Sequence, residues 1–125
     1  GSGAYMEGIY FPPYRHYRLR YVSDDKTIKI FEYVKGAVIK GKFKSNFPVK
    51  ISYEVILTHM KFTYYDSLLT DSAGNFCVVV PYSTTANNFY HFTMHNKVYN
   101  VSVTEENIQY GDTIFVRNQQ GGIYE

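Results

Sequence analysis

The most regular pattern in the chain is an alternation of hydrophobic and polar residues over positions 48–58. The hydrophobic residues occupy every second position, namely Val49, Ile51, Tyr53, Val55 and Leu57. Lys50, Ser52 and Glu54 lie between them. Because successive side chains of a strand point to opposite faces, this period of two places the hydrophobic side chains on one face. The pattern predicts a long β-strand, from Pro48 to Thr58, with one buried face.

Shorter segments of the same kind follow one another along the chain. We expect further strands over residues 17–22, 28–34, 37–43, 60–69, 76–80, 89–95, 98–104 and 113–117. Residues 76–80 form a continuous apolar run, which predicts a central strand with Cys77 as a buried, inert thiol. Pro81 ends this run because proline has no N–H to donate to a sheet.

Turn residues separate these segments. The clearest turn is 70–75, where Asp71 favours local hydrogen bonds and Gly74 is expected to adopt a positive φ. Gly111 is expected in another turn, before the last strand.

The composition favours the same class of structure. The chain has 12 Val, 9 Ile and 9 Thr but only 4 Leu and 4 Ala, and β-branched residues suit strands better than helices. The sequence therefore predicts an all-β domain, a single antiparallel β-sandwich of roughly eight or nine strands.

The length of 125 residues corresponds to one domain. Residues 1–3 are typical of a cloning remnant, and residues 4–27 are predicted to be a connecting segment with a possible first strand. We expect the sandwich to span residues 28–118 and to be followed by a flexible tail over 119–125. No run of 18 apolar residues occurs, so the sequence predicts no membrane-spanning helix.

Charge is distributed unevenly along the chain. Residues 15–61 hold 11 Lys and Arg against 4 Asp and Glu, a net charge of +7, whereas residues 62–125 hold 2 against 6, a net charge of −4. Lys40, Lys42 and Lys44 have the period-two spacing of one strand face. We expect them to contact an anionic membrane surface or an acidic neighbouring domain. The alternative is a solvated strand face without a partner.

The sequence predicts no catalytic, cofactor-binding or metal-binding residues. His91 and His95 have the spacing of a zinc pair on a helix, but four residues along a strand separate them by about 13 Å. Asn100-Val101-Ser102 is a glycosylation sequon, which makes Asn100 a candidate glycan acceptor. A sequon within a strand is a poor acceptor.

The aromatic content leaves two alternatives open. The chain has 14 Tyr and 9 Phe, which in an all-β domain serve mainly as core residues and cross-strand pairs. With the lysines they could also form the stacking platform of a nucleic-acid-binding β-barrel. A carbohydrate-binding module is the third interpretation, and the absence of tryptophan weakens it.

Two segments carry a resemblance to a known family. Residues 28–37 (Ile-Lys-Ile-Phe-Glu-Tyr-Val-Lys-Gly-Ala), preceded by His16-Tyr17-Arg18-Leu19, resemble the archaeal oligosaccharyltransferase catalytic subunit (archaeal glycosylation protein B) where its central soluble domain passes into a peripheral β-domain. Residues 70–76 and 78–84 are similar to the same peripheral domain. More loosely, residues 36–41 and the turn at 71–74 resemble carboxypeptidase-regulatory-like sandwiches, which belong with Ig-like folds.

The resemblance implies a parent enzyme on the extracytoplasmic face of the archaeal cell membrane. It would transfer an oligosaccharide from a dolichol-linked donor to the Asn of Asn-x-Ser/Thr sequons, with a divalent metal, Mn or Mg, held by carboxylates of its membrane part. Its acceptor-recognition motif, Trp-Trp-Asp-Tyr-Gly, is absent here, so no functional residue of the family can be assigned to a position of this chain. The resemblance implies a non-catalytic accessory domain whose partners are the other soluble and transmembrane domains of the parent chain, with no nucleic acid.

Overall fold

The computed structural model describes residues 4–6, 9–11, 14–58 and 60–116. The expected remnant at 1–3 and tail at 119–125 lie outside these residues, as does His59. The elements in chain order are β1 (Ala4–Met6), β2 (Ile9–Phe11), β3 (Tyr17–Val22), β4 (Lys29–Tyr33), β5 (Ala37–Lys42), β6 (Pro48–Ile56), β7 (Lys61–Leu69), β8 (Asn75–Val80), β9 (Tyr90–Met94), β10 (Lys97–Val101), α1 (Glu105–Tyr110) and β11 (Thr113–Phe115). No described helix is long and apolar enough to cross a membrane.

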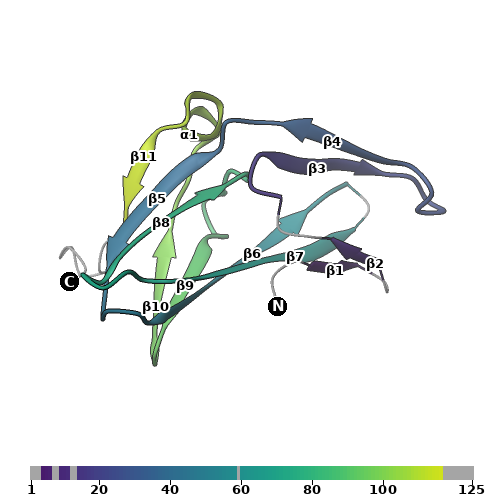
Figure 1. The fold of residues 1–125 in the computed structure, drawn as a ribbon. Coiled ribbons are helices and arrows are strands. Elements are labelled where there is room, and N and C mark those ends of the chain that lie inside the picture. Colours follow the sequence, from purple (N-terminus) through teal and green to yellow (C-terminus); the bar gives the residue numbers. More distant parts are fainter. Residues whose placement is uncertain (1–3, 7–8, 12–13, 59, 117–125) are drawn as a thin grey trace.

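Two sheets form the body of the domain (Figure 1). One has four strands in the order β10-β9-β6-β7, and the other has three in the order β11-β5-β8. The hairpin β3–β4 projects beyond the start of β5, and the short pair β1–β2 lies near β7. This arrangement confirms the all-β sandwich that the sequence predicts.

The long strand β6 shows how the hydrophobic pattern becomes a sheet. It pairs in antiparallel register with β7 from Pro48 opposite Leu69 to Ile56 opposite Lys61. Its buried residues are the predicted alternate ones, Val49, Ile51, Tyr53 and Val55. On the other side β6 pairs with β9, which brings Phe92 opposite Ile51. Burial of one face in this register excludes a one-residue slip, because a slip would expose the whole set.

Aromatic side chains fill the space between the sheets. The Tyr53 and Tyr90 rings stack with centroids 4.6 Å apart, and the Phe76 ring stacks on Phe92 at 6.0 Å. The hydroxyl of Tyr90 donates to the carbonyl of Tyr82 and accepts from its backbone N–H, so this buried polar group is satisfied. Core packing thus uses most of the aromatic residues of the two sheets, which does not favour a nucleic-acid stacking platform.

Two features depart from a purely antiparallel sandwich. Strand β11 runs parallel to β5, whereas every other described pair is antiparallel. The reason is helix α1, which was not predicted from the sequence and which reverses the chain before β11 (Figure 1). Thr104 caps the helix by accepting from the Asn107 N–H, and Gly111 ends it in the left-handed conformation at φ 71°. Gly111 therefore lies in a turn, as predicted, but as a helix C-cap.

The prediction for Cys77 is wrong, because this residue is exposed. Strand β8 lies at the edge of its sheet, and only one of its faces meets the core. Phe76, Val78 and Val80 point inward, whereas Cys77 points outward. A continuous apolar run is typical of a strand buried on both faces, but the burial along β8 alternates.

The hairpin β3–β4 is tied to the sandwich by charge. Arg18 on β3, 2% exposed, bonds to Glu105 at the start of α1 and to Glu32 on β4. Nearby, Arg15 bonds through two nitrogens to the buried carboxylate of Asp66 on β7. The boundary expected between residues 27 and 28 falls within the turn of this hairpin, between β3 and β4.

Candidate functional site

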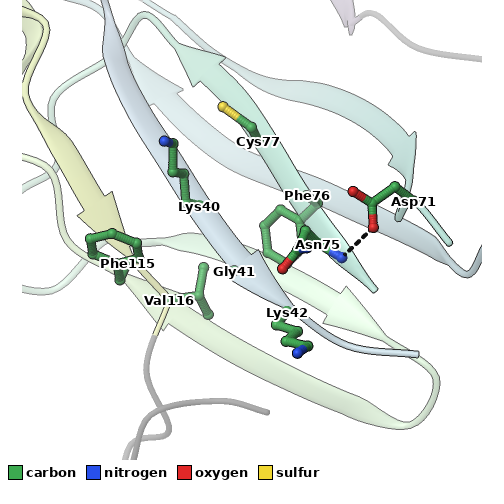
Figure 2. A pocket seen from close by; sticks show the side chains of 9 residues that line it. All are labelled: Lys40, Gly41, Lys42, Asp71, Asn75, Phe76, Cys77, Phe115 and Val116. Carbon is green, nitrogen blue, oxygen red and sulfur yellow. Dashed lines mark hydrogen bonds between the residues drawn. The ribbon is translucent and has the colours of Figure 1, made fainter. Parts of the chain in front are cut away.

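A pocket of about 460 Å³ opens on the three-stranded sheet (Figure 2). All three strands and the turn before β8 contribute to it. Its lining consists of Lys40, Gly41, Lys42, Asp71, Asn75, Phe76, Cys77, Phe115 and Val116. The pocket contains two of the three lysines expected on one strand face and one of the predicted turn residues.

Strand register explains how these side chains come together. Lys40 on β5 lies opposite Cys77 on β8 and opposite Phe115 on β11. Lys42 lies opposite Asn75. Residues directly opposite on neighbouring strands share a face of the sheet, so Phe115, Lys40 and Cys77 form one outward row. All of these side chains are exposed.

The two lysines carry charge that the fold does not neutralise. No described carboxylate lies within ion-pair distance of the Lys40 or Lys42 ammonium group. Figure 2 shows the two side chains leaving β5 at opposite ends of the pocket. The pocket therefore has two positive charges, that of Lys40 next to the exposed Phe115 ring and that of Lys42 next to the Asn75 amide.

Lys44 does not join the other two lysines. It follows the end of β5, and its Nζ lies 5.6 Å from the centre of the Phe43 ring and 5.5 Å from that of Phe47. These are cation–π contacts, which hold the ammonium against the two rings. The structure thus places Lys40 and Lys42 together and Lys44 apart. The expected contact with an anionic membrane surface stays a prediction.

The turn at 71–75 forms one wall of the pocket. The Asp71 carboxylate accepts hydrogen bonds from the backbone N–H groups of Ala73 and Asn75, at 2.9 and 2.8 Å. Gly74 has φ 88°, which confirms the predicted positive φ. A Cβ on Gly74 would lie 2.1 Å from the Phe43 carbonyl oxygen, so only glycine fits this close approach.

The floor of the pocket depends on Gly41. Phe76 is buried and turns its ring under β5, where a Cβ on Gly41 would lie 2.4 Å from the Phe76 Cζ. The missing side chain of Gly41 lets the Phe76 ring pack beneath the strand, on the face opposite to Lys40 and Lys42. Neither Gly41 nor Phe115 was predicted from the sequence as part of a site. Phe115 and Val116 are consecutive residues of the strand expected over 113–117, so their side chains point to opposite faces. This alternation was the only sequence signal for the outward direction of Phe115, since Val116 points inward.

Asn100 lies away from this pocket. It is half-buried on β10, an edge strand of the four-stranded sheet, and its Oδ1 lies 2.9 Å from His91 Nδ1. Val101 of the sequon is buried and Ser102 is exposed. The structure thus places Asn100 and Val101 in a folded edge strand, with Ser102 directly after its end, and modification of Asn100 stays a prediction.

The described residues contain no group of three or more His, Cys, Asp or Glu side chains placed to hold a metal ion. His91 lies on β9, and His95 lies in the turn that follows, with φ 58°. The other conspicuous charged groups are Arg15–Asp66 and Arg18–Glu105, and each is a bonded pair that joins two parts of the fold. Sequence reasoning missed both pairs because their partners lie 51 and 87 residues apart.

Residues 36–114 match the archaeal glycosylation protein B long peripheral domain. The chain belongs to this family. The matched range runs from the entry into β5 to within β11, and so includes seven of the nine pocket residues but not Phe115 or Val116. The hairpin β3–β4 precedes it.

Relatives of this peripheral domain are archaeal enzymes of much greater length. The chain is 32% identical over 100 residues to dolichyl-phosphooligosaccharide-protein glycotransferase 3 of Archaeoglobus fulgidus, a match that covers 74% of this chain and 12% of the enzyme. The crystal structure of the Archaeoglobus fulgidus oligosaccharyltransferase with Zn and sulfate is similar, with TM-score 0.62 and 30% identity, over 70% of this chain and 12% of that one. The structure of the same organism's enzyme with an inhibitory peptide and a dolichol-phosphate gives the same TM-score and identity. The chain thus spans about an eighth of the relative's length.

Proposed function

We propose that this peripheral domain acts as a non-catalytic, structural part of an archaeal oligosaccharyltransferase. The observation that carries the proposal is the family match over residues 36–114. The parent enzyme would transfer a dolichol-linked oligosaccharide to the Asn of Asn-x-Ser/Thr sequons. Its divalent metal would be bound elsewhere in the parent chain, which would lie in the archaeal cell membrane with this domain on the extracytoplasmic side.

The internal bonding of the domain supports a structural role. Arg18 and Asp66, the two most buried charged residues of the described part of the chain, are each held by two charge-assisted hydrogen bonds to one partner. Such pairs fix the N-terminal segment and the hairpin β3–β4 to the sandwich. Attachment of Arg15 and of the hairpin to the sandwich suits a module that positions its neighbours in the same chain.

A transfer assay tests the non-catalytic role. The chain is incubated with a sequon peptide, a dolichol-linked oligosaccharide and Mn²⁺, and the peptide is examined by mass spectrometry. The full-length Archaeoglobus fulgidus relative is the positive control under identical conditions. We expect glycopeptide from the control and none from this chain. Metal-dependent glycopeptide formation by the chain alone would overturn the proposal.

The parentage is tested on the gene. The coding sequence around this chain is expected to encode several membrane-spanning segments and a Trp-Trp-Asp-Tyr-Gly motif. A flanking sequence without both features would overturn the assignment of the parent enzyme.

A further inference from the structure

We propose that the pocket between β5, β8 and β11 binds an acidic sugar, that is, a pyranose that carries a carboxylate, sulfate or phosphate group. The proposal draws on the proposed function only for the source of the sugar, an oligosaccharide handled by the parent enzyme. The residues that would form the site are shown in Figure 2.

The charge of the pocket selects an anion. Lys40 and Lys42 have no described ion-pair partner, whereas Lys61 is paired with Glu54. Asp71 is the only carboxylate among the lining residues, and its Oδ1 is already occupied by two backbone N–H groups. Two ammonium groups against one such carboxylate leave a net positive charge. Exposed ammonium groups attract anions that enter the pocket, and salt screens this attraction.

Phe115 supplies the surface for a sugar ring. Its side chain is 56% exposed, and Phe115 lies on β11 directly opposite Lys40 on the neighbouring strand β5. The apolar C–H face of a pyranose can pack on the electron-rich face of such a ring, while the hydroxyl groups at the rim of the sugar stay accessible to polar partners. The Asn75 amide, beside Lys42, has both a donor and an acceptor for these hydroxyls. The aromatic ring, the amide and the two cations match the parts of an acidic sugar.

The shape of the site favours a sugar over a membrane surface. A volume of about 460 Å³ lies within the range of small-ligand sites, roughly 300–1,000 Å³. A flat anionic bilayer would instead be met by a row of lysines on a level face. Here Lys44 is turned onto Phe43 and Phe47, and the remaining two lysines border a hollow. A hollow with a ring-sized aromatic wall suits a discrete ligand.

An NMR titration tests the proposal. The ¹⁵N-labelled chain is titrated at low salt with trigalacturonate, and separately with neutral maltotriose of the same number of rings. We expect trigalacturonate to shift the amide signals of residues 40–42 and 75–77, with binding at least tenfold tighter than that of maltotriose. High salt should weaken the binding.

Matched variants locate the site. The double variant Lys40→Gln, Lys42→Gln should bind trigalacturonate at least tenfold more weakly, and Phe115→Ala at least threefold more weakly. Lys97→Gln and Tyr110→Ala are the controls, because both residues are exposed and lie on other elements. Both control variants should bind trigalacturonate as tightly as the unsubstituted domain does. If Phe115→Ala does not fold, Phe115→Leu is used instead, because leucine is also apolar but has no flat ring for the sugar to pack on.

Several outcomes would overturn the proposal. These are equal binding of maltotriose, no binding of trigalacturonate at 10 mM, unchanged binding by the lysine variant, or signal shifts confined to the four-stranded sheet. Binding to phosphatidylglycerol vesicles without binding to trigalacturonate would assign the lysines to a lipid surface instead. The titration involves no transfer reaction, so an absence of sugar binding would not contradict the proposed function. Glycopeptide formation by the chain in the transfer assay would contradict the proposed function but not the sugar site.

Discussion

Arg18 and Glu105 bind each other through two parallel hydrogen bonds, Nη1 to Oε1 at 2.8 Å and Nη2 to Oε2 at 2.5 Å. The pair joins the hairpin β3–β4 to the first turn of α1, 87 residues further along the chain. Ser83 and Gln109 also donate to the Glu105 carboxylate. These hydrogen bonds, that of Arg18 above all, lower the pKa of Glu105 to about 2.

Substitution of Glu105 should reduce stability in a pH-dependent way. The folded-state pKa lies below the ordinary value of 4.5, so the stabilisation is present above about pH 4.5 and is lost as the pH falls towards 2. A shift of this size corresponds to roughly 3 kcal/mol, but the Glu105 side chain is 51% exposed and solvent screens the pair. We therefore expect Glu105→Gln to lower the free energy of unfolding by about 1 kcal/mol at pH 7.

Urea unfolding at several pH values checks this expectation. The difference in the free energy of unfolding between the unsubstituted domain and Glu105→Gln should shrink as the pH falls from 5 to 2. Glu106→Gln is the matched control, since Glu106 is also exposed, lies in the same helical turn and makes no described ion pair. A difference that stays constant down to pH 2 would contradict the role assigned to the Arg18–Glu105 pair.

Gly74 should not tolerate a side chain. Gly74→Val combines a left-handed φ of 88° with a clash against the Phe43 carbonyl oxygen. We expect a loss of about 2 kcal/mol or more in the free energy of unfolding. Ala73→Val, one residue earlier and exposed, should change it by less than about 0.5 kcal/mol. Thermal unfolding followed by circular dichroism measures both, and equal melting temperatures for the two variants would show that the turn adapts.

Local patterns predicted the strands well. Alternation over residues 48–58 worked because one face of β6 is buried and the other is not, so the sequence had to carry the period of the strand. Asp71 and Gly74 were identified because the chemistry of the turn is local. The same reasoning failed at Cys77, where both the inward and the outward residues of an edge strand are apolar.

Helix α1 was missed because its signals are weak. It has six residues and one buried side chain, Ile108, so it shows no helical period. Its capping box uses Asn107 where Glu or Gln is usual. The pocket was beyond local reasoning for another reason. Lys40 and Phe115 meet only because α1 reverses the chain and places β11 parallel to β5.

Asn100 should be a poor glycan acceptor in the folded domain. Its side chain is bonded to His91 and the next residue, Val101, is buried, so the sequon cannot enter an enzyme cleft without local unfolding of β10. We expect a peptide of residues 97–104 to be glycosylated at least tenfold faster than the folded chain by the Archaeoglobus fulgidus relative. Mass spectrometry of both substrates in one reaction measures the ratio. Equal rates would show that β10 opens readily, and Asn100→Gln should abolish the product from either substrate.

Tyr82 should make the domain sensitive to alkali. Its hydroxyl is buried beneath the hairpin β3–β4 and accepts a hydrogen bond from the Leu19 N–H at 2.8 Å. Burial raises the pKa of Tyr82 to about 12, against an ordinary value of 10. The folded state therefore holds the proton more tightly than the unfolded state, and stability is lost as the pH rises from 10 to 12. Over this window the shift corresponds to roughly 2–3 kcal/mol.

Tyr82→Phe separates the hydrogen bond from the titration. At pH 7 the variant should be less stable by about 1–3 kcal/mol, because the buried Leu19 N–H loses its acceptor. Between pH 10 and 12 the difference in stability between the variant and the unsubstituted domain should narrow, because the phenyl ring of the variant has no proton to lose. The other buried tyrosines titrate in both proteins and do not contribute to this change. Tyr110→Phe, at a position that is 69% exposed, is the control and should have the same free energy of unfolding as the unsubstituted domain at every pH. Denaturant unfolding from pH 7 to pH 12 provides the measurement, and a stability difference that is the same at both ends would show that ionisation of Tyr82 does not drive alkaline unfolding.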